Sequence, residues 1–272
     1  MFKLIKHTHP ILKSEKFKKD EISFNILLAI IQDYKKYPDM KCYSDEKDCF
    51  LLNTDEKHPV IIWTSSDFNR YEDLYRFLIK TFFYLSPLNL MTNKKCYQFF
   101  KSKDSINTSA HIDTIGVYEC KKLNPIEFKG QIDIPTPSEK EIIFQMIKDF
   151  YYEADQDKGY SDSYYMELGN TFINQPETHK VWRDETGEIA SIGRLQIVDD
   201  KARIGRIYTL PEKRGKSYAK MLVYKLTQLA FEKELLPVLY TNFDYEPSNK
   251  CYQAIGFKLL ENILIYSIKK ES

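Results

Sequence analysis

The segment YTLPEKRGKSYAKML, residues 208–222, holds the residue types in this chain that are best suited to chemistry. It joins an apolar, β-branched run to an amphipathic pattern, with Arg214, Gly215, Lys216 and Ser217 between them. A helix that begins at such a junction has backbone N–H groups without partners at the positive end of its dipole. Small residues let a phosphate approach those groups, and the two cations add charge. The pattern is typical of a pyrophosphate site, and the alternative is an ordinary glycine turn with solvated cations.

The Gly-Lys-Ser triplet does not belong to a nucleoside-triphosphate loop. That loop has the pattern GxxxxGK[ST], because its first glycine lets the backbone wrap the phosphates. The position five residues before Gly215 is Leu210. The sequence therefore excludes this class of nucleotide-binding site.

A second motif follows the junction. The segment PVLYTNFDYEPSNKCYQAIGFK, residues 237–258, predicts a strand and then a short helix. Together the two segments resemble the acetyl-CoA-binding core of the GNAT-type N-acetyltransferases. That family carries Arg/Gln-x-x-Gly-x-Gly/Ala after its fourth strand, and here the pattern runs from Arg214 to Ala219. The Asn, Tyr and Gly-Phe positions of its last helix are matched by Asn249, Tyr252, Gly256 and Phe257.

Two positions depart from the family pattern. Ser217 stands where the family usually has its second glycine, which predicts pyrophosphate binding that is retained but weaker. Tyr245 stands where an asparagine is often seen, seven residues before the tyrosine. One pantetheine contact of the family therefore lacks its usual residue here.

The resemblance implies that the chain binds acetyl-CoA as a co-substrate. The end of the strand at 202–210 is expected to splay from its neighbour, so that backbone groups bind the pantetheine arm and orient the thioester. The residues expected to contact the cofactor are Ile207, Tyr208, Thr209, Arg214, Gly215, Lys216, Ser217, Tyr218, Ala219 and Asn249.

Tyr252 is the expected general acid. Acyl transfer needs a neutral amine to attack and a thiolate to leave, and a phenol with a pKa of about 10 can protonate that thiolate. The alternative is a packing residue in a chain with 20 tyrosines, but the spacing of Tyr252 before Gly256 and Phe257 favours the acid.

No general base is assigned from the sequence. Five acids lie in the 150–170 segment, where this fold commonly builds its acceptor site: Glu153, Asp155, Asp157, Asp162 and Glu167. They would attract a cationic amine, although a solvated acidic loop explains them more simply.

Composition limits the remaining classes of function. Lys+Arg 40 against Asp+Glu 39 gives a formal charge of +1, so no basic excess suggests a nucleic-acid partner. Five cysteines without a CxxC spacing argue against a disulfide framework and against a metal site. The longest apolar run, at 26–31, is too short to span a membrane. These features predict a cytoplasmic protein with no membrane partner.

The patterns predict an α/β (α+β) chain of two domains. Residues 1–130 form the first, a smaller α/β domain that could be a degenerate GNAT-like copy without a CoA site. Residues 131–272 form the second, a GNAT-type domain with a mixed, mainly antiparallel sheet flanked by helices. In this half a capping box at Ser138 and Glu141 starts a helix, and the strand candidates are 179–185, 188–198 and 202–210. In the last of these, apolar residues break strict alternation, which predicts a bulge near Gly205 or Arg206.

The expected function is an N-acetyltransferase that moves an acetyl group from acetyl-CoA to a primary amine of a small-molecule or peptide acceptor. Two alternatives stay open from the sequence. The first is a module that holds acyl-CoA, or docks a protein, without turnover. The second is a transferase of a longer acyl group.

Overall fold

A computed structural model describes residues 1–85, 87–103, 109–154 and 159–268. The chain divides into two compact units. The first unit comprises Met1–Val117, Thr241–Asp244 and Leu260–Ser272, and the second comprises Tyr118–Tyr240 and Tyr245–Leu259. The predicted domains, 1–130 and 131–272, stay a prediction. In this division by contacts the end of the last strand belongs to the first unit, where it hydrogen-bonds to β5 (Leu88–Thr92).

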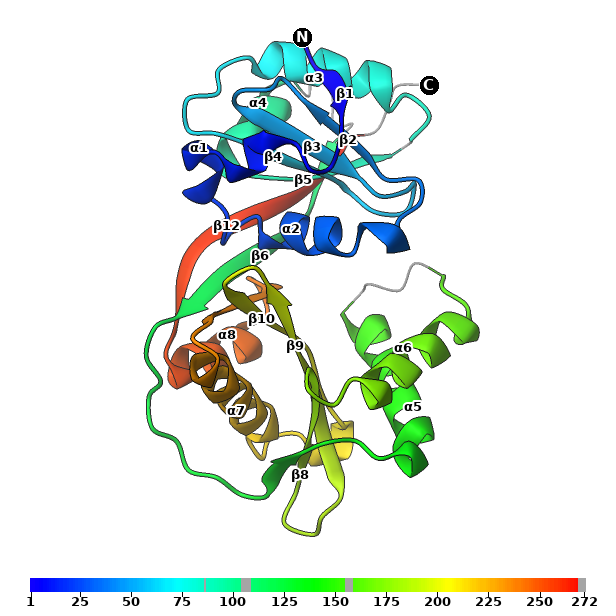
Figure 1. Cartoon of the computed structure of the whole chain (residues 1–272), viewed down its shortest axis with the longest axis vertical. Coiled ribbons are helices and arrows are strands. Elements are labelled where there is room, and N and C mark those ends of the chain that lie inside the picture. Colours follow the sequence, from blue (N-terminus) through cyan, green and yellow to red (C-terminus); the bar gives the residue numbers. More distant parts are fainter. Residues whose placement is uncertain (86, 104–108, 155–158, 269–272) are drawn as a thin grey trace. The chain divides into compact units, whose positions relative to one another are not determined.

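The second unit contains a sheet with helices on both faces (Figure 1). Its elements are β7 (Gln131–Asp133), α5 (Lys140–Glu153), α6 (Asp162–Asn174), β8 (His179–Arg183), β9 (Ile189–Val198), β10 (Lys201–Thr209), α7 (Tyr218–Glu232), β11 (Leu236–Asn242), α8 (Glu246–Ile255) and β12 (Phe257–Ile268). The ends of β11 and β12 also contribute residues to the first unit. Strands β7 to β10 pair antiparallel in chain order, whereas β10 and β11 pair parallel. The predicted mainly antiparallel sheet is confirmed.

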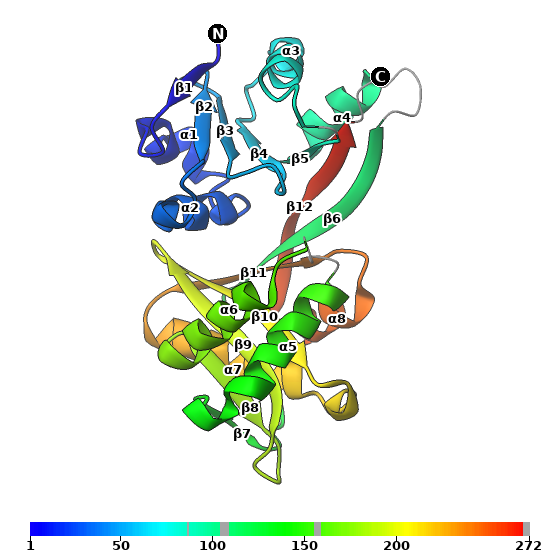
Figure 2. The same cartoon turned by 90° about the vertical axis from the view of Figure 1, so that its right-hand side faces the viewer.

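Two apolar clusters cover the faces of this sheet. On one face α7 packs its buried side chains, including Leu222 and Leu226, against strand residues such as Leu195 and Ile204. On the other face α5 and α6 pack against β8, β9 and Tyr208 (Figures 1 and 2). Residues three and four apart share one face of a helix, which is why α7 buries its apolar positions against the sheet.

The capping box before α5 lies two residues earlier than the sequence predicts. The capping box joins Thr136 to Glu139, not Ser138 to Glu141, and Glu139 Oε2 accepts from the Thr136 N–H at 2.7 Å. Pro137 explains the shift, because proline favours the first position of a helical turn, where no N–H is needed. The turn that follows the cap is a short 3-10 helix, Pro137–Glu139, and α5 begins directly after it.

The first unit repeats the same order of elements. It contains β1 (Lys3–Ile5), α1 (Glu15–Lys18), α2 (Asn25–Gln32), β2 (Lys41–Ser44), β3 (Cys49–Asn53), β4 (Val60–Thr64), α3 (Tyr71–Thr81), β5 (Leu88–Thr92), α4 (Lys94–Ser102) and β6 (Ser109–Cys120). Strands β2, β3 and β4 are antiparallel and β4 pairs parallel with β5, as β8 to β11 do in the second unit. Each unit thus has a strand, two helices, three antiparallel strands and a helix that leads to a parallel strand.

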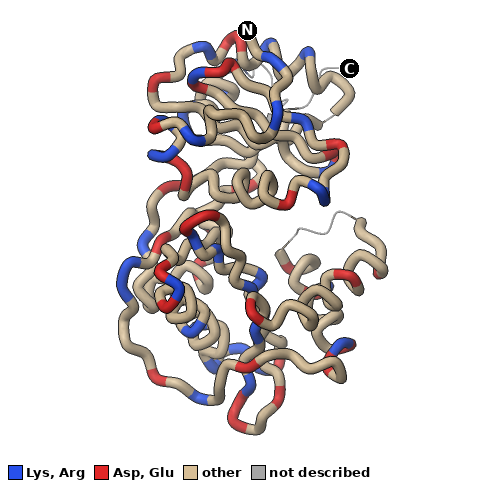
Figure 3. Tube along the Cα trace, viewed as in Figure 1, with Lys and Arg blue, Asp and Glu red and all other residues tan. Residues whose placement is uncertain are grey.

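Opposite charges are interspersed along the trace of each unit (Figure 3). The N-terminal lysines illustrate this, since Lys16 pairs with Asp48 at 2.6 Å and Lys3 pairs with Glu46 at 2.7 Å. Within the described ranges, no helix is long and apolar enough to cross a membrane. The same ranges contain no group of three or more His, Cys, Asp or Glu side chains suited to a metal ion.

Candidate functional site

The start of α7 presents open backbone to solvent. Gly215 has φ 79° and Ser217 has φ 65° and ψ 17°, and the residues from Arg214 to Ser217 are all exposed. Ser217 is the N-cap of the helix, but its side chain caps no backbone N–H. The first N–H groups of α7 therefore lack a side-chain acceptor and point outward, as an anion site requires.

Ser217 also explains why its position favours glycine in the family pattern. A left-handed backbone costs a residue with a Cβ roughly 1–2 kcal/mol, whereas glycine adopts it freely. The serine thus keeps the geometry of the turn at a cost in strain. The turn itself matches the predicted junction between strand and helix.

The loop before the turn is fixed to the neighbouring hairpin. Lys213 Nζ lies 2.6 Å from Asp184 Oδ2 and 2.6 Å from Glu188 Oε2, at the turn between β8 and β9. The hydrogen bond from Lys213 holds the pKa of Asp184 well below its ordinary value. Asp184 also accepts from the backbone N–H groups of Thr186 and Glu188. These bonds position the backbone that leads into α7.

Arg214 is held by an acid. Its Nη2 lies 2.7 and 2.8 Å from the two carboxylate oxygens of Glu153, and its Nε donates to the Thr209 carbonyl at 3.0 Å. Tyr208 Oη donates to the same carboxylate at 3.2 Å. An anion at the start of α7 would therefore compete with Glu153 for the guanidinium.

Strand β10 leaves its parallel partner just before this loop. The ladder joins Lys201–Ile204 to Leu236–Leu239, and β10 continues to Thr209. The register with β9 shifts between Gly205 and Tyr208, and Arg206 has φ 52°, so the predicted bulge is confirmed. Beyond the bulge Tyr208 and Thr209 pair with β9 on one edge. Their other edge faces away from β9 and lies beyond the ladder with β11, so it suits a ligand that carries amides.

Two of the residues expected at the cofactor already have side-chain partners. Tyr218 is buried and its Oη donates to Glu185 Oε2 at 2.6 Å, a bond that raises the pKa of this phenol to about 12. Asn249 is buried too: its Oδ1 accepts from Tyr118 Oη at 2.9 Å, and its Nδ2 donates to the Tyr245 carbonyl at 3.0 Å. Tyr218 thus offers a ligand its backbone N–H, and a cofactor contact to the Asn249 side chain would have to replace one of these bonds.

Tyr252 lies on α8, partly buried against the cluster beneath α7. Its ring makes an edge contact with Phe257, with the ring centroids 6.3 Å apart. Burial raises the pKa of its phenol above the ordinary value. The phenol is protonated at neutral pH, as an ordinary tyrosine is, and this is the form that a general acid needs.

The described acids of the 150–170 segment, Glu153, Asp162 and Glu167, do not form one cluster. Glu153 pairs with Arg214, whereas Asp162 accepts from Lys148 Nζ at 2.8 Å. Glu167 is exposed on α6. Asp155 and Asp157 lie outside the described residues.

The second half of the chain is similar to a known protein family. Residues 140–257 match the Acetyltransferase (GNAT) family. These residues form a GNAT acetyltransferase domain. The open turn at Ser217 and the bulge of β10 both lie inside it. Among curated proteins, none matches this sequence.

Solved structures share the fold of the whole chain at low sequence identity. An acetyltransferase of the GNAT family from Colwellia psychrerythraea has 16% identity and a TM-score of 0.63, with 99% of this chain and 100% of that chain covered. A GCN5-related N-acetyltransferase from Sphaerobacter thermophilus has 9% identity and a TM-score of 0.68, with coverage of 99% and 95%. A tandem GNAT protein from the clavulanic acid biosynthesis pathway has 9% identity and a TM-score of 0.63, with coverage of 100% and 99%. These likenesses agree with the repeated element order.

The first unit differs from the GNAT domain at the equivalent strand ends. Asn93 Nδ2 donates to the carbonyl of Thr64 at 3.2 Å and to its Oγ1 at 2.9 Å, which joins the ends of β4 and β5. Helix α3 has Arg70 at its N-cap with φ −94°, and no residue of 65–70 has a positive φ. The features that open the backbone in the GNAT domain are therefore absent from this described junction.

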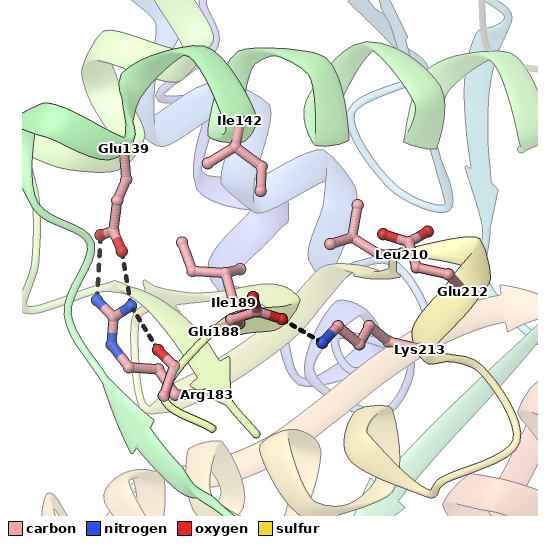
Figure 4. Close-up of a pocket in the computed structure, with 9 residues that line it drawn as sticks. Glu139, Ile142, Arg183, Glu188, Ile189, Leu210, Glu212 and Lys213 are labelled. Atoms are coloured by element: carbon pink, nitrogen blue, oxygen red, sulfur yellow. Dashed lines mark hydrogen bonds and ion pairs between the residues drawn. The ribbon is translucent and has the colours of Figure 1, made fainter. Parts of the chain in front are cut away.

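A shallow cavity lies at the other end of the loop before α7 (Figure 4). Ile142, Ile189 and Leu210 supply its apolar lining. Its charged side chains are satisfied by pairs, such as Arg183 with Glu139 at 2.6 Å and Lys213 with Glu188. Because these charges neutralise one another, the cavity does not supply the unpaired cations that a pyrophosphate requires.

Proposed function

We propose that the protein is an N-acetyltransferase that transfers an acetyl group from acetyl-CoA to a primary amine, and that the GNAT domain carries the reaction. The observation that supports this most directly is the exposed backbone at Gly215 and Ser217, next to the free edge of β10. Bound acetyl-CoA would supply an activated thioester. The residues proposed to hold it are those expected from the sequence. Tyr218 would contribute its backbone N–H, and the Asn249 side chain would contact the cofactor only after it loses its hydrogen bond to Tyr118 or to the Tyr245 carbonyl.

The roles of the protein groups follow from their positions. The first N–H groups of α7 and the side chains of Arg214 and Lys216 would hold the pyrophosphate. The free edge of β10 at Ile207, Tyr208 and Thr209 would bind the pantetheine amides and fix the thioester. The neutral amine nitrogen bonds to the carbonyl carbon and releases one proton to solvent, the carbon–sulfur bond breaks, and Tyr252 gives its proton to the departing thiolate and is reprotonated from solvent. Positioning of this kind lowers the entropy cost of bringing two reactants together.

Thermal melts and turnover test this proposal separately. A ligand that binds only the native state at a hundredfold excess over its dissociation constant stabilises the fold by about 2.7 kcal/mol. Millimolar acetyl-CoA should therefore raise the melting temperature, and release of free CoA thiol should depend on an added amine. An unchanged melt would contradict the CoA site. A raised melt without amine-dependent release would indicate a binding module, and faster release from a longer acyl-CoA would revise the acyl group.

A further inference from the structure

Arg206 occupies the bulge of β10 in a conformation that is unfavourable for arginine. Its φ of 52° costs a residue with a Cβ roughly 1–2 kcal/mol, and such strain persists mainly at functional sites. The side chain is half-buried and turns toward α5. Its Nη2 donates to Tyr151 Oη at 3.2 Å, and its guanidinium carbon lies 5.9 Å from the centroid of that ring.

The charge of Arg206 has no acidic partner within the described residues. A guanidinium carries five N–H donors, and the bond to Tyr151 uses one of them. Glu153, the acid at the end of α5, is held by Arg214 and Tyr208. A half-buried guanidinium without a carboxylate is incompletely compensated for its lost hydration. This side chain is therefore well suited to bind an anion.

His179 shows that the surroundings of Arg206 do not cancel this charge. The imidazole is 1% exposed; its Nδ1 lies 3.0 Å from Thr178 Oγ1, and its Nε2 has no hydrogen-bond partner in the described structure. Burial, together with the charges of Arg194 and Arg206, lowers the pKa of His179 to about 4. The histidine is thus neutral at pH 7 and adds no charge of its own beside Arg206.

We propose that Arg206 binds a carboxylate of the acceptor, so that the acceptor is an amine with a carboxylate close to its amino group, as in a free amino acid. This inference rests on the proposed function. The bulge is the point where β10 leaves β11, and the thioester is proposed to lie at this free edge. A carboxylate held by the guanidinium would place the adjacent amino group beside the same edge. Arginine suits this role because its planar fork matches a carboxylate.

The amine must be neutral to react. The acceptor arrives as an ammonium ion and must lose a proton to solvent before its nitrogen attacks. The neutral nitrogen then bonds to the carbonyl carbon as the carbon–sulfur bond breaks. Tyr252 protonates the thiolate, the second proton of the nitrogen passes to solvent, and solvent reprotonates Tyr252. Arg206 contributes by holding the carboxylate, which positions the nitrogen for this attack.

Matched acceptors test the assignment on the full chain. The pairs are tyrosine with tyramine, phenylalanine with phenethylamine, and lysine with cadaverine, which differ only in the carboxylate. With saturating acetyl-CoA, kcat/KM for CoA release should be at least tenfold higher for the amino acid in a pair. Arg206→Asn should remove most of that preference, and asparagine tolerates a positive φ. Arg203→Gln is the control, because it removes an arginine from the same strand that stacks on Tyr240 instead.

The outcomes separate this inference from the proposed function. A preference that Arg206→Asn removes and Arg203→Gln keeps, with an unchanged shift of the melt by acetyl-CoA, supports the assignment. Equal rates within each pair, or turnover restricted to amines without a carboxylate, overturns it while the proposed function stands. If acetyl-CoA binds but no amine reacts, the acceptor assignment and the proposed acetyl transfer both fail. If acetyl-CoA does not bind, the proposed function itself fails.

Discussion

At the scale of residues, the ion pair between Arg214 and Glu153 controls the charge available at the start of α7. Glu153 holds the guanidinium through both carboxylate oxygens. A phosphate would have to displace this carboxylate or share the guanidinium with it. Under the proposed function, this pair would lower the affinity for CoA, an effect that the motif itself does not reveal.

Two opposite variants test this balance. Arg214→Ala should weaken binding of CoA more than binding of pantetheine, which lacks phosphate, by at most a few kcal/mol. Glu153→Gln should tighten CoA binding a few-fold, because it removes a competing charge and keeps the side-chain shape. Titration calorimetry with both ligands measures the effects. Equal losses for CoA and pantetheine in Arg214→Ala would mean that the arginine acts through folding.

Tyr252→Phe tests the proposed general acid. The change removes one oxygen and keeps the ring that packs near Phe257. Turnover should fall by about 10²–10⁴-fold, the usual contribution of general acid catalysis, while acetyl-CoA affinity stays nearly constant. Steady-state rates and calorimetry give the two values. Full turnover with the best acceptor, under conditions where chemistry limits the rate, would show that another group protonates the thiolate.

At the scale of elements, Gly256 decides how α8 ends and β12 begins. It has φ 120°, and a Cβ added there would lie 2.3 Å from the Lys122 carbonyl oxygen. Neither the backbone conformation nor the space accepts a side chain, which explains the Gly-Phe pair of the second motif. The position is therefore fixed by the packing of α8 against the chain near residue 122.

Gly256→Ala should destabilise the fold by about 2–4 kcal/mol, because it combines overpacking against backbone with a strained φ. Gly205→Ala is the matched control, since a Cβ there meets nothing within 4 Å and its φ is not in the left-handed region. Denaturant unfolding of both variants measures the difference. Similar stabilities of the two variants would contradict the proposed clash.

At the scale of the whole molecule, two units with the same element order are proposed to divide the work. The first has its strand ends joined by Asn93, whereas the GNAT domain has them open. Titration calorimetry on the full chain should therefore find one CoA per chain. The full chain is the proper sample, because Leu264–Ile268 of β12 pair with β5 in the first unit and would lose that partner in a fragment. A stoichiometry of two would overturn this division of labour.

Local patterns in the sequence are sufficient to predict the backbone of the site. The junction at 214–219, the bulge near Arg206 and the helix that follows depend on residues close together in the chain. Glycine, proline and apolar spacing restrict the backbone within a few residues, so such features can be recognised without knowing the fold. The capping box shows the limit of this approach, since it lies two residues earlier than predicted, where Pro137 begins a 3-10 turn.

Only the tertiary structure decides which side chains are free to act. Glu153 and Arg214 are 61 residues apart in the chain, and Tyr118 and Asn249 are 131 apart. These pairings follow from how α5, β6 and α8 pack, and no local pattern encodes them. The same holds for Arg206, whose direction toward Tyr151 depends on the bulge and on the helix packed over it. Composition and spacing thus determine where the backbone opens before α7, whereas long-range packing determines which charged side chains there are paired.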